Sequence, residues 1–159
     1  MRKLLIVLMT FSLIACGTAQ TVVIEPPKTR STFSSIVIVA NNPAVDVPPE
    51  ITSIFEQELR KGLFEEGPFT VGNDLKLVYT FVGQDSGDRL ARWFWGGIGN
   101  AGEGSLTVLV RYVDSSGAEI AKTQVEGRIG SGFFGGSMDD AVIKAAQDVA
   151  KYTVSNFKQ

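Results

Sequence analysis

A β-branched, apolar run, residues 105–114 (SLTVLVRYVD), leads into the tetrapeptide Asp114-Ser115-Ser116-Gly117. Residues 118–129 follow it with alternating polar and apolar side chains. Such runs are typical of β-strands, and Asp, Ser and Gly are residues that tight turns favour. The pattern predicts an antiparallel hairpin, which would bring Ser105 and Ile129 together at one end of a sheet.

The rest of the chain predicts a mixed element order. Residues 35–40 (SIVIVA) and 75–82 (LKLVYTFV) are expected as strands, and residues 22–24 offer a further, short edge strand. Helices are expected between these two strands and at the end of the chain, from apolar residues at helical spacing. In the first helix these are Ile51, Ile54, Phe55, Leu59 and Leu63, and in the second Met138, Val142, Ala145, Ala146, Val149, Tyr152 and Phe157.

This β-α-β-β-β-α order predicts an α+β fold. We expect one mixed sheet of four to five strands, with two helices packed on one face. The exposed side of the first helix offers (i, i+4) ion pairs between Glu56 and Arg60 and between Lys61 and Glu65.

The chain begins MRKLLIVLMTFSLIAC. A short basic region precedes an apolar run over residues 4–15, which is too short to span a bilayer and is typical of a signal peptide. A buried N-terminal helix is the alternative. The segment Leu13-Ile14-Ala15-Cys16 resembles the lipobox of bacterial lipoproteins.

That resemblance implies a diacylglycerol on the thiol of Cys16, further acylation such as palmitate, and a mature chain that begins there. Gly17 follows the cysteine, where an aspartate would imply retention in the inner membrane. The implied location is the outer membrane, with the domain facing the periplasm. We expect residues 1–15 to be a signal peptide, residues 16–33 a lipidated tether, and residues 34–159 one domain.

Composition excludes several kinds of active site. The chain has no histidine and a single cysteine, so Ser-His-Asp triads, Cys-His pairs and imidazole zinc sites are absent. Carboxylate pairs remain at Glu65-Glu66, Asp85/Asp88 and Asp139-Asp140, which leaves a carboxylate-based hydrolase as an alternative. For Asp139-Asp140 a helix N-terminus capped by Ser137 explains the acids more simply. We predict a non-enzymatic protein without metal or cofactor.

Two segments match the nucleotide-binding pattern G-x-G-x-x-G, at residues 97–102 and 130–135. The first is followed by a predicted strand instead of a helix, and the second opens a helix that ends the chain. Neither has the context that binds a dinucleotide. Because no basic run is present, nucleic acid is not expected as a partner either.

The predicted hairpin brings these two glycine-rich segments to the same end of the sheet. One contains Trp93, Phe94 and Trp95, preceded by Arg89 and Arg92; the other contains Phe133 and Phe134. The rings either cap the core or remain exposed as a surface for a partner protein or the membrane interface. The glycines that would let backbones approach there are Gly96, Gly97, Gly99, Gly102, Gly104, Gly130, Gly132, Gly135 and Gly136.

The lipobox together with GDRLARWFWGGIGNAGEGSLTVLVRYVDSSGAEIA and the alanine-rich final helix resembles a family of Gram-negative lipoproteins. These carry the glycine-rich domain of unknown function numbered 4410, a family that implies no activity or site residue. More distantly, the element order is similar to that of curli-secretion lipoproteins and of the Tol-Pal translocation protein.

We therefore expect a non-enzymatic outer-membrane lipoprotein that serves envelope assembly or protein interaction. The membrane is contacted through the lipid on Cys16, and the partner is another envelope protein or a second copy of the chain. The alternative is a periplasmic binder of a small ligand or anion, held where the second glycine-rich segment opens the helix at Ser137.

Overall fold

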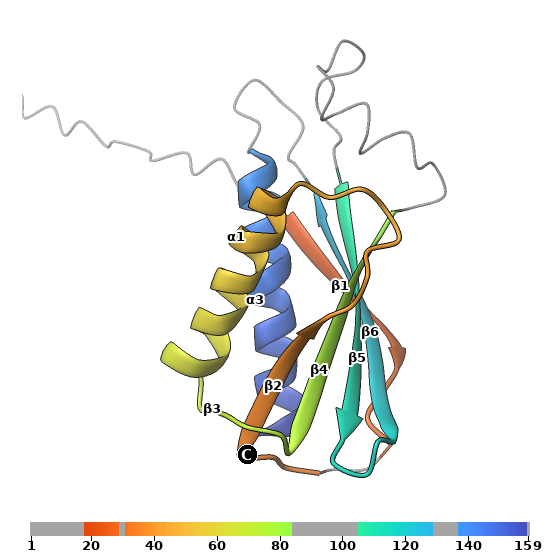
Figure 1. The fold of residues 1–159 in the computed structure, drawn as a ribbon, viewed down its shortest axis with the longest axis vertical. Helices are drawn as coiled ribbons and strands as arrows, with labels where there is room; N and C mark the ends of the chain where they lie inside the picture. Colours follow the sequence, from red (N-terminus) through yellow and green to blue (C-terminus); the bar gives the residue numbers. More distant parts are fainter. Residues whose placement is uncertain (1–17, 29–30, 84–104, 129–136, 159) are drawn as a thin grey trace, which may run out of the picture.

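Six strands form one mixed sheet in the spatial order β1-β6-β5-β4-β2-β3 (Figure 1). The computed structural model describes residues 18–28, 31–83, 105–128 and 137–158. Strand β2 is parallel to both of its neighbours, and the other pairs are antiparallel. The strands are β1 (Thr18–Glu25), β2 (Ser35–Ala40), β3 (Thr70–Val71), β4 (Leu75–Val82), β5 (Ser105–Asp114) and β6 (Glu119–Arg128).

The predicted α+β class and mixed sheet are confirmed, but the described residues hold six strands instead of four to five. The additional strands are the two edges of the sheet. Strand β1 occupies part of the segment expected as a tether, and it is longer than the edge pairing considered over residues 22–24. Strand β3 has two residues, too few to show a periodic pattern in the sequence.

The predicted hairpin is confirmed. Strands β5 and β6 pair antiparallel from Ser105 opposite Arg128 to Val113 opposite Glu119. In the connecting turn, the Asp114 carboxylate accepts hydrogen bonds from the backbone N–H groups of Ser116 at 2.9 Å and Ala118 at 3.0 Å. Gly117 has φ of 88°, a left-handed conformation that glycine adopts without strain. A hydrogen bond from the Ser116 hydroxyl, followed by the bonds from backbone N–H groups, lowers the pKa of Asp114.

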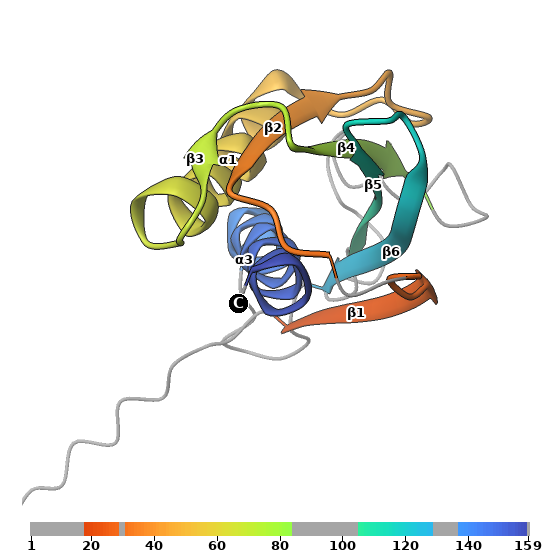
Figure 2. The same cartoon turned by 90° about the horizontal axis from the view of Figure 1, so that it is seen from below.

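Two helices cover one face of the sheet, and Figure 2 shows the sheet curving around the second of them. Helix α1 spans Pro49–Arg60 and continues as a π-helical turn, η1, over Lys61–Glu65; helix α3 spans Met138–Phe157. The wider turn aligns residues five apart, and Lys61 pairs with Glu66 at 3.3 Å instead of with Glu65 as predicted.

The predicted pair between Glu56 and Arg60 is also replaced by another contact. The Glu56 carboxylate accepts a hydrogen bond of 2.5 Å from the Tyr79 hydroxyl of β4, which joins α1 to the sheet. Partial burial, followed by this hydrogen bond to a carboxylate, raises the pKa of Tyr79.

The core lies between the helices and the sheet. Alternate residues of β4 and β5 point into it, and the predicted stripes of both helices are buried there except for the half-buried Ile54 and Tyr152. The Tyr112 hydroxyl lies 3.0 Å from Thr153 Oγ1, which donates its proton to the Val149 carbonyl at 2.7 Å. Tyr112 is therefore the donor, and burial raises its pKa. The inward strand residues are Leu75, Leu77, Tyr79, Phe81, Leu106, Val108, Val110 and Tyr112.

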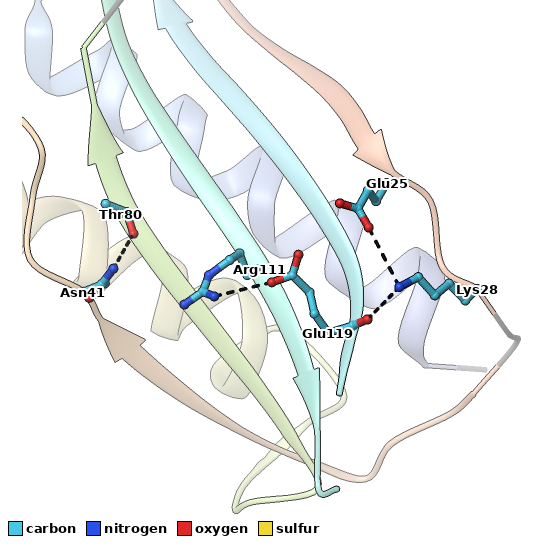
Figure 3. Close-up of polar contacts among 6 residues, drawn as sticks. All are labelled: Glu25, Lys28, Asn41, Thr80, Arg111 and Glu119. Atoms are coloured by element: carbon cyan, nitrogen blue, oxygen red, sulfur yellow. Dashed lines mark hydrogen bonds and ion pairs between the residues drawn. The ribbon is translucent and has the colours of Figure 1, made fainter. Parts of the chain in front are cut away.

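The opposite face of the sheet carries polar pairs (Figure 3). The Asn41 amide donates to the Thr80 hydroxyl at 3.3 Å, and Arg111 of β5 lies 3.4 Å from Glu119 of β6. These groups are at least partly exposed to water, whereas Val78 and Thr107 on the same face are buried.

Candidate functional site

The predicted hairpin matters for function because of where it places the chain connections. Val82, the last residue of β4, is opposite Thr107, and Ser105 is opposite Arg128. Arg128 is also the partner of Thr18, the first residue of β1. These pairings place Thr18, Val82, Ser105 and Arg128 together, and we call this end of the strands the Ser105 end. The other end of the strands, with the turn that contains Gly117, is the turn end.

Helix α3 also begins near the Ser105 end (Figure 1). A Cβ atom on Gly127 would lie 3.0 Å from the carbonyl carbon of Ala141, in the first turn of that helix. Both connections that carry the predicted aromatic residues, between Val82 and Ser105 and between Arg128 and Ser137, are thus attached at one end of the sheet. The predicted convergence of their ends is confirmed.

The residues of those connections are outside the part of the chain that the structure describes. This applies to every member of the predicted interaction surface, to the lipidation site and to the carboxylates Asp85 and Asp88. The predicted residues concerned are Cys16, Arg89, Arg92, Trp93, Phe94, Trp95, Phe133, Phe134, Gly96, Gly97, Gly99, Gly102, Gly104, Gly130, Gly132, Gly135 and Gly136.

The N-terminus of α3 is occupied by its own side chains. The Ser137 hydroxyl accepts a hydrogen bond from the Asp140 N–H at 3.1 Å, and the Asp140 carboxylate accepts one from the Ser137 N–H at 2.9 Å. This capping box gives Asp140 the structural role expected for it. A carboxylate already bound at the helix start repels a second anion, so the arrangement disfavours the predicted anion site.

The capping box predicts a pH-dependent effect of replacing Asp140 with asparagine. Bonds from the Ser137 backbone and hydroxyl lower the pKa of Asp140 below its ordinary value of 3.8. Its stabilising contribution is therefore present above pH 3.8 and disappears as the pH falls through the lower folded-state value. We expect the Asp140→Asn variant to melt below the wild type at neutral pH, and the two curves to converge in acid. Asp139→Asn, which has no described capping bond, is the control; a constant difference at all pH values would contradict the assignment.

A shallow groove lies between β1 and the C-terminal half of α3. It has a volume of about 270 Å³ and is lined by Thr21, Asp148, Lys151, Tyr152, Ser155 and Asn156. The Thr21 hydroxyl donates to Asp148 at 3.4 Å, whereas the buried Tyr152 hydroxyl has no partner among the described residues. Ligand pockets are usually deeper and mainly apolar, with volumes of roughly 300–1,000 Å³. The groove is a weak candidate for a ligand site.

Strand β1 presents a larger unusual surface. As the last strand on its side of the sheet, it pairs with β6 alone among the strands that the structure describes. Val22, Val23 and Ile24 are 50%, 44% and 45% exposed. Proteins usually protect an edge strand with charges, proline or a bulge, because its free backbone groups can pair with another strand. Here a register shift between Val23 and Glu25 gives only local protection.

Strand β1 is fixed at both ends. Thr18 pairs with Arg128 at the Ser105 end, and beyond Glu25 the backbone N–H of Lys28 donates to the Ile120 carbonyl at 3.2 Å. The Lys28 ammonium also bonds to the Glu119 carbonyl at 3.2 Å and lies 3.9 Å from Glu25, as Figure 3 shows. The segment runs along the whole length of β6 as part of the sheet.

The described residues contain no group of three or more Cys, Asp or Glu side chains placed to hold a metal ion. In the same ranges, no helix has the length and apolar character needed to cross a bilayer.

Comparison with solved structures identifies a similar fold. No protein-family model matches the chain, and no curated protein sequence matches it significantly. PelC from Paraburkholderia phytofirmans, solved as a dodecamer, is 15% identical with a TM-score of 0.54, over 89% of this chain and 98% of PelC. A dodecameric PelC point variant gives 16% identity and a TM-score of 0.52, over 90% of this chain and 99% of the variant.

A third structure, a Xanthomonas campestris protein assigned to the domain of unknown function 330, is 14% identical with a TM-score of 0.46. The alignment covers 81% of this chain and 86% of the other. At these identities the likeness to PelC shows the fold alone, and the third likeness is too weak to carry an argument.

Proposed function

We propose that this chain is a non-enzymatic, lipid-anchored protein of the outer membrane, facing the periplasm, whose domain associates with further copies of itself. The observation that carries the proposal is the open, apolar edge of β1, with Val22, Val23 and Ile24 about half exposed. The sequence around Cys16 supports the anchor, and the resemblance to lipoproteins with the domain numbered 4410 agrees with it.

The physical argument starts from the backbone of β1. Every second N–H and C=O group of an edge strand points away from the sheet, and a strand from another molecule can bind them in register. Apolar side chains beside those groups add burial of about 25 cal/mol per Å² to the hydrogen bonds. A second β1 strand, related by a two-fold axis, would present the same surface.

The opposite edge of the sheet is a poorer partner. Strand β3 has two residues, so a ladder along it would contain few hydrogen bonds. Val71 on that strand is 73% exposed but stands alone there, without an apolar run beside it. PelC, which was solved as a dodecamer, shows that a similar fold is compatible with association of copies, and it specifies neither the contact nor the number of subunits here.

The predicted alternatives have less support. A small-ligand binder would need a deeper site than the groove beside Thr21, and an anion binder would compete with Asp140 at the start of α3. A carboxylate-based hydrolase would need two acids facing each other across a cleft. Among the described pairs, Glu65-Glu66 is exposed at the end of η1, and Asp140 caps a helix.

Introducing lysines into the β1 edge is expected to break self-association. In a two-fold pair of β1 strands, Val22→Lys with Ile24→Lys would replace apolar contacts by like charges on neighbouring strands. We therefore expect the dissociation constant to rise by at least about tenfold, which corresponds to about 1.4 kcal/mol. The measurement is sedimentation of the full chain in density-matched detergent over a range of concentrations.

Val71→Lys is the control for adding a lysine to an edge strand, because it places one such charge on the other edge at a more exposed valine. It should leave the association unchanged. The wild type, the double variant and Val71→Lys should all have the same melting temperature. A wild-type chain that sediments as a monomer at every concentration, or an equal effect of Val71→Lys, would rule out association through β1.

A further inference from the structure

We infer that the Ser105 end of the sheet lies against the lipid surface, with the turn end pointing away from it. The inference rests on the proposed lipid anchor and adds the orientation of the domain and the surface that meets the membrane. The occupant of this surface is the headgroup layer of the membrane that holds the acyl chains.

The first step is the length of chain between the anchor and the sheet. Cys16 precedes Thr18 by two residues, and two residues span at most about 7 Å. Thr18 is already paired with Arg128, so the sheet begins where the anchor ends. A flexible tether over residues 16–33 would let the domain move far from the membrane. A strand that starts at Thr18 keeps the domain close to it.

The second step is the rigidity of β1. Pairing with β6 runs from Thr18 to Glu25, and Lys28 bonds to Ile120 and Glu119 near the turn end. The inner side of β1 also contacts α3, where Thr21 bonds to Asp148. Releasing the strand to lengthen the tether would break this ladder, so the short connection persists in the folded protein.

The third step is the direction of the sheet. Strand β5 extends ten residues from Ser105 to Asp114, which places the turn end about 30 Å from the Ser105 end. One end of the molecule is therefore held within a few ångströms of the headgroups while the other stands clear of them. The two connections that hold the predicted aromatic residues are attached at the membrane-proximal end.

Two acyl chains are enough for stable anchoring, so the orientation can be measured on the acylated full chain. Gln20 is exposed near the Ser105 end, and Ser115 is exposed in the turn. With Cys16 acylated and no other cysteine present, Gln20→Cys and Ser115→Cys each accept one fluorophore. The proteins are placed in vesicles of phosphatidylethanolamine and phosphatidylglycerol that contain a headgroup-linked nitroxide quencher.

We expect the label at position 20 to be quenched several-fold more than the label at position 115. A Gly-Ser insertion between Gly17 and Thr18 is the matched control and should reduce this contrast, because it supplies the tether that the native chain lacks. Equal quenching of the two labels in an acylated chain, or stronger quenching at position 115, would overturn the inference alone. Mass spectrometry that finds no acyl group on Cys16 would overturn the proposed anchor, and the inference with it.

Discussion

Replacing Phe55 with alanine is expected to lower the free energy of unfolding by about 3–5 kcal/mol. Phe55 is fully buried in α1, and its ring lies 5.0 Å from that of Tyr79 and 5.4 Å from that of Phe81. Truncation removes the ring contacts of Phe55 with β4 and leaves a cavity that neighbouring rings cannot fill without leaving their own positions. Urea denaturation of the monomeric Val22→Lys/Ile24→Lys background would measure the change separately from association.

Phe64→Ala provides the comparison for this variant. Phe64 lies one to two turns beyond Leu59, is partly buried, and packs against the border of the same core. The same truncation should therefore lower the free energy of unfolding clearly less at position 64. Equal losses for the two variants would show that the α1–sheet contact does not dominate the stability of this side of the domain.

The two proposals fit together geometrically. Strands β1, β4, β5 and β6 run between the Ser105 end and the turn end, so a domain that stands on its Ser105 end holds β1 upright on the membrane. The free hydrogen-bonding groups of β1 then point along the membrane plane, towards neighbouring anchored copies. Confinement to a surface raises the effective concentration of such copies, so a weak edge contact would suffice for association.

Much of the fold could be predicted from local patterns. The hairpin of β5 and β6 follows from an alternating run and an Asp-Ser-Ser-Gly turn, and the buried faces of α1 and α3 follow from helical spacing. These signals are local because each element carries its own periodicity and its own turn or cap. The convergence of chain connections at the Ser105 end then follows from the hairpin alone.

The edges of the sheet were harder to predict. None of the residues of β1 is fully buried, so burial imposes only a weak apolar/polar alternation on TAQTVVIE. Its register is set by β6, about one hundred residues later. The three adjacent β-branched residues 22–24 indicate a strand, but a shorter one than β1. Strand β3 and the π-helical turn depend on tertiary packing, since two or five residues carry little pattern of their own.

The second large effect is expected from Gly127→Val, which would push α3 away from β6 near the Ser105 end. A Cβ atom at this position would meet the Ala141 carbonyl oxygen and lie 3.0 Å from its carbon and 3.3 Å from the Ala145 Cβ. Because backbone cannot swing aside as a side chain can, we expect a loss of at least about 3 kcal/mol, at the upper end of overpacking effects. Amide exchange should increase most around Ala141 and Ala145.

Gln124→Val adds a β-branched side chain to the outward face of the same strand and is the control for the change in side-chain type. It should leave stability within about 0.5 kcal/mol of the wild type. If Gly127→Val proved equally mild, α3 could not be in contact with β6 at this point. The start of α3 would then be free to move relative to Thr18 and Ser105, and a fixed membrane-facing end of the domain would lose one of its structural supports.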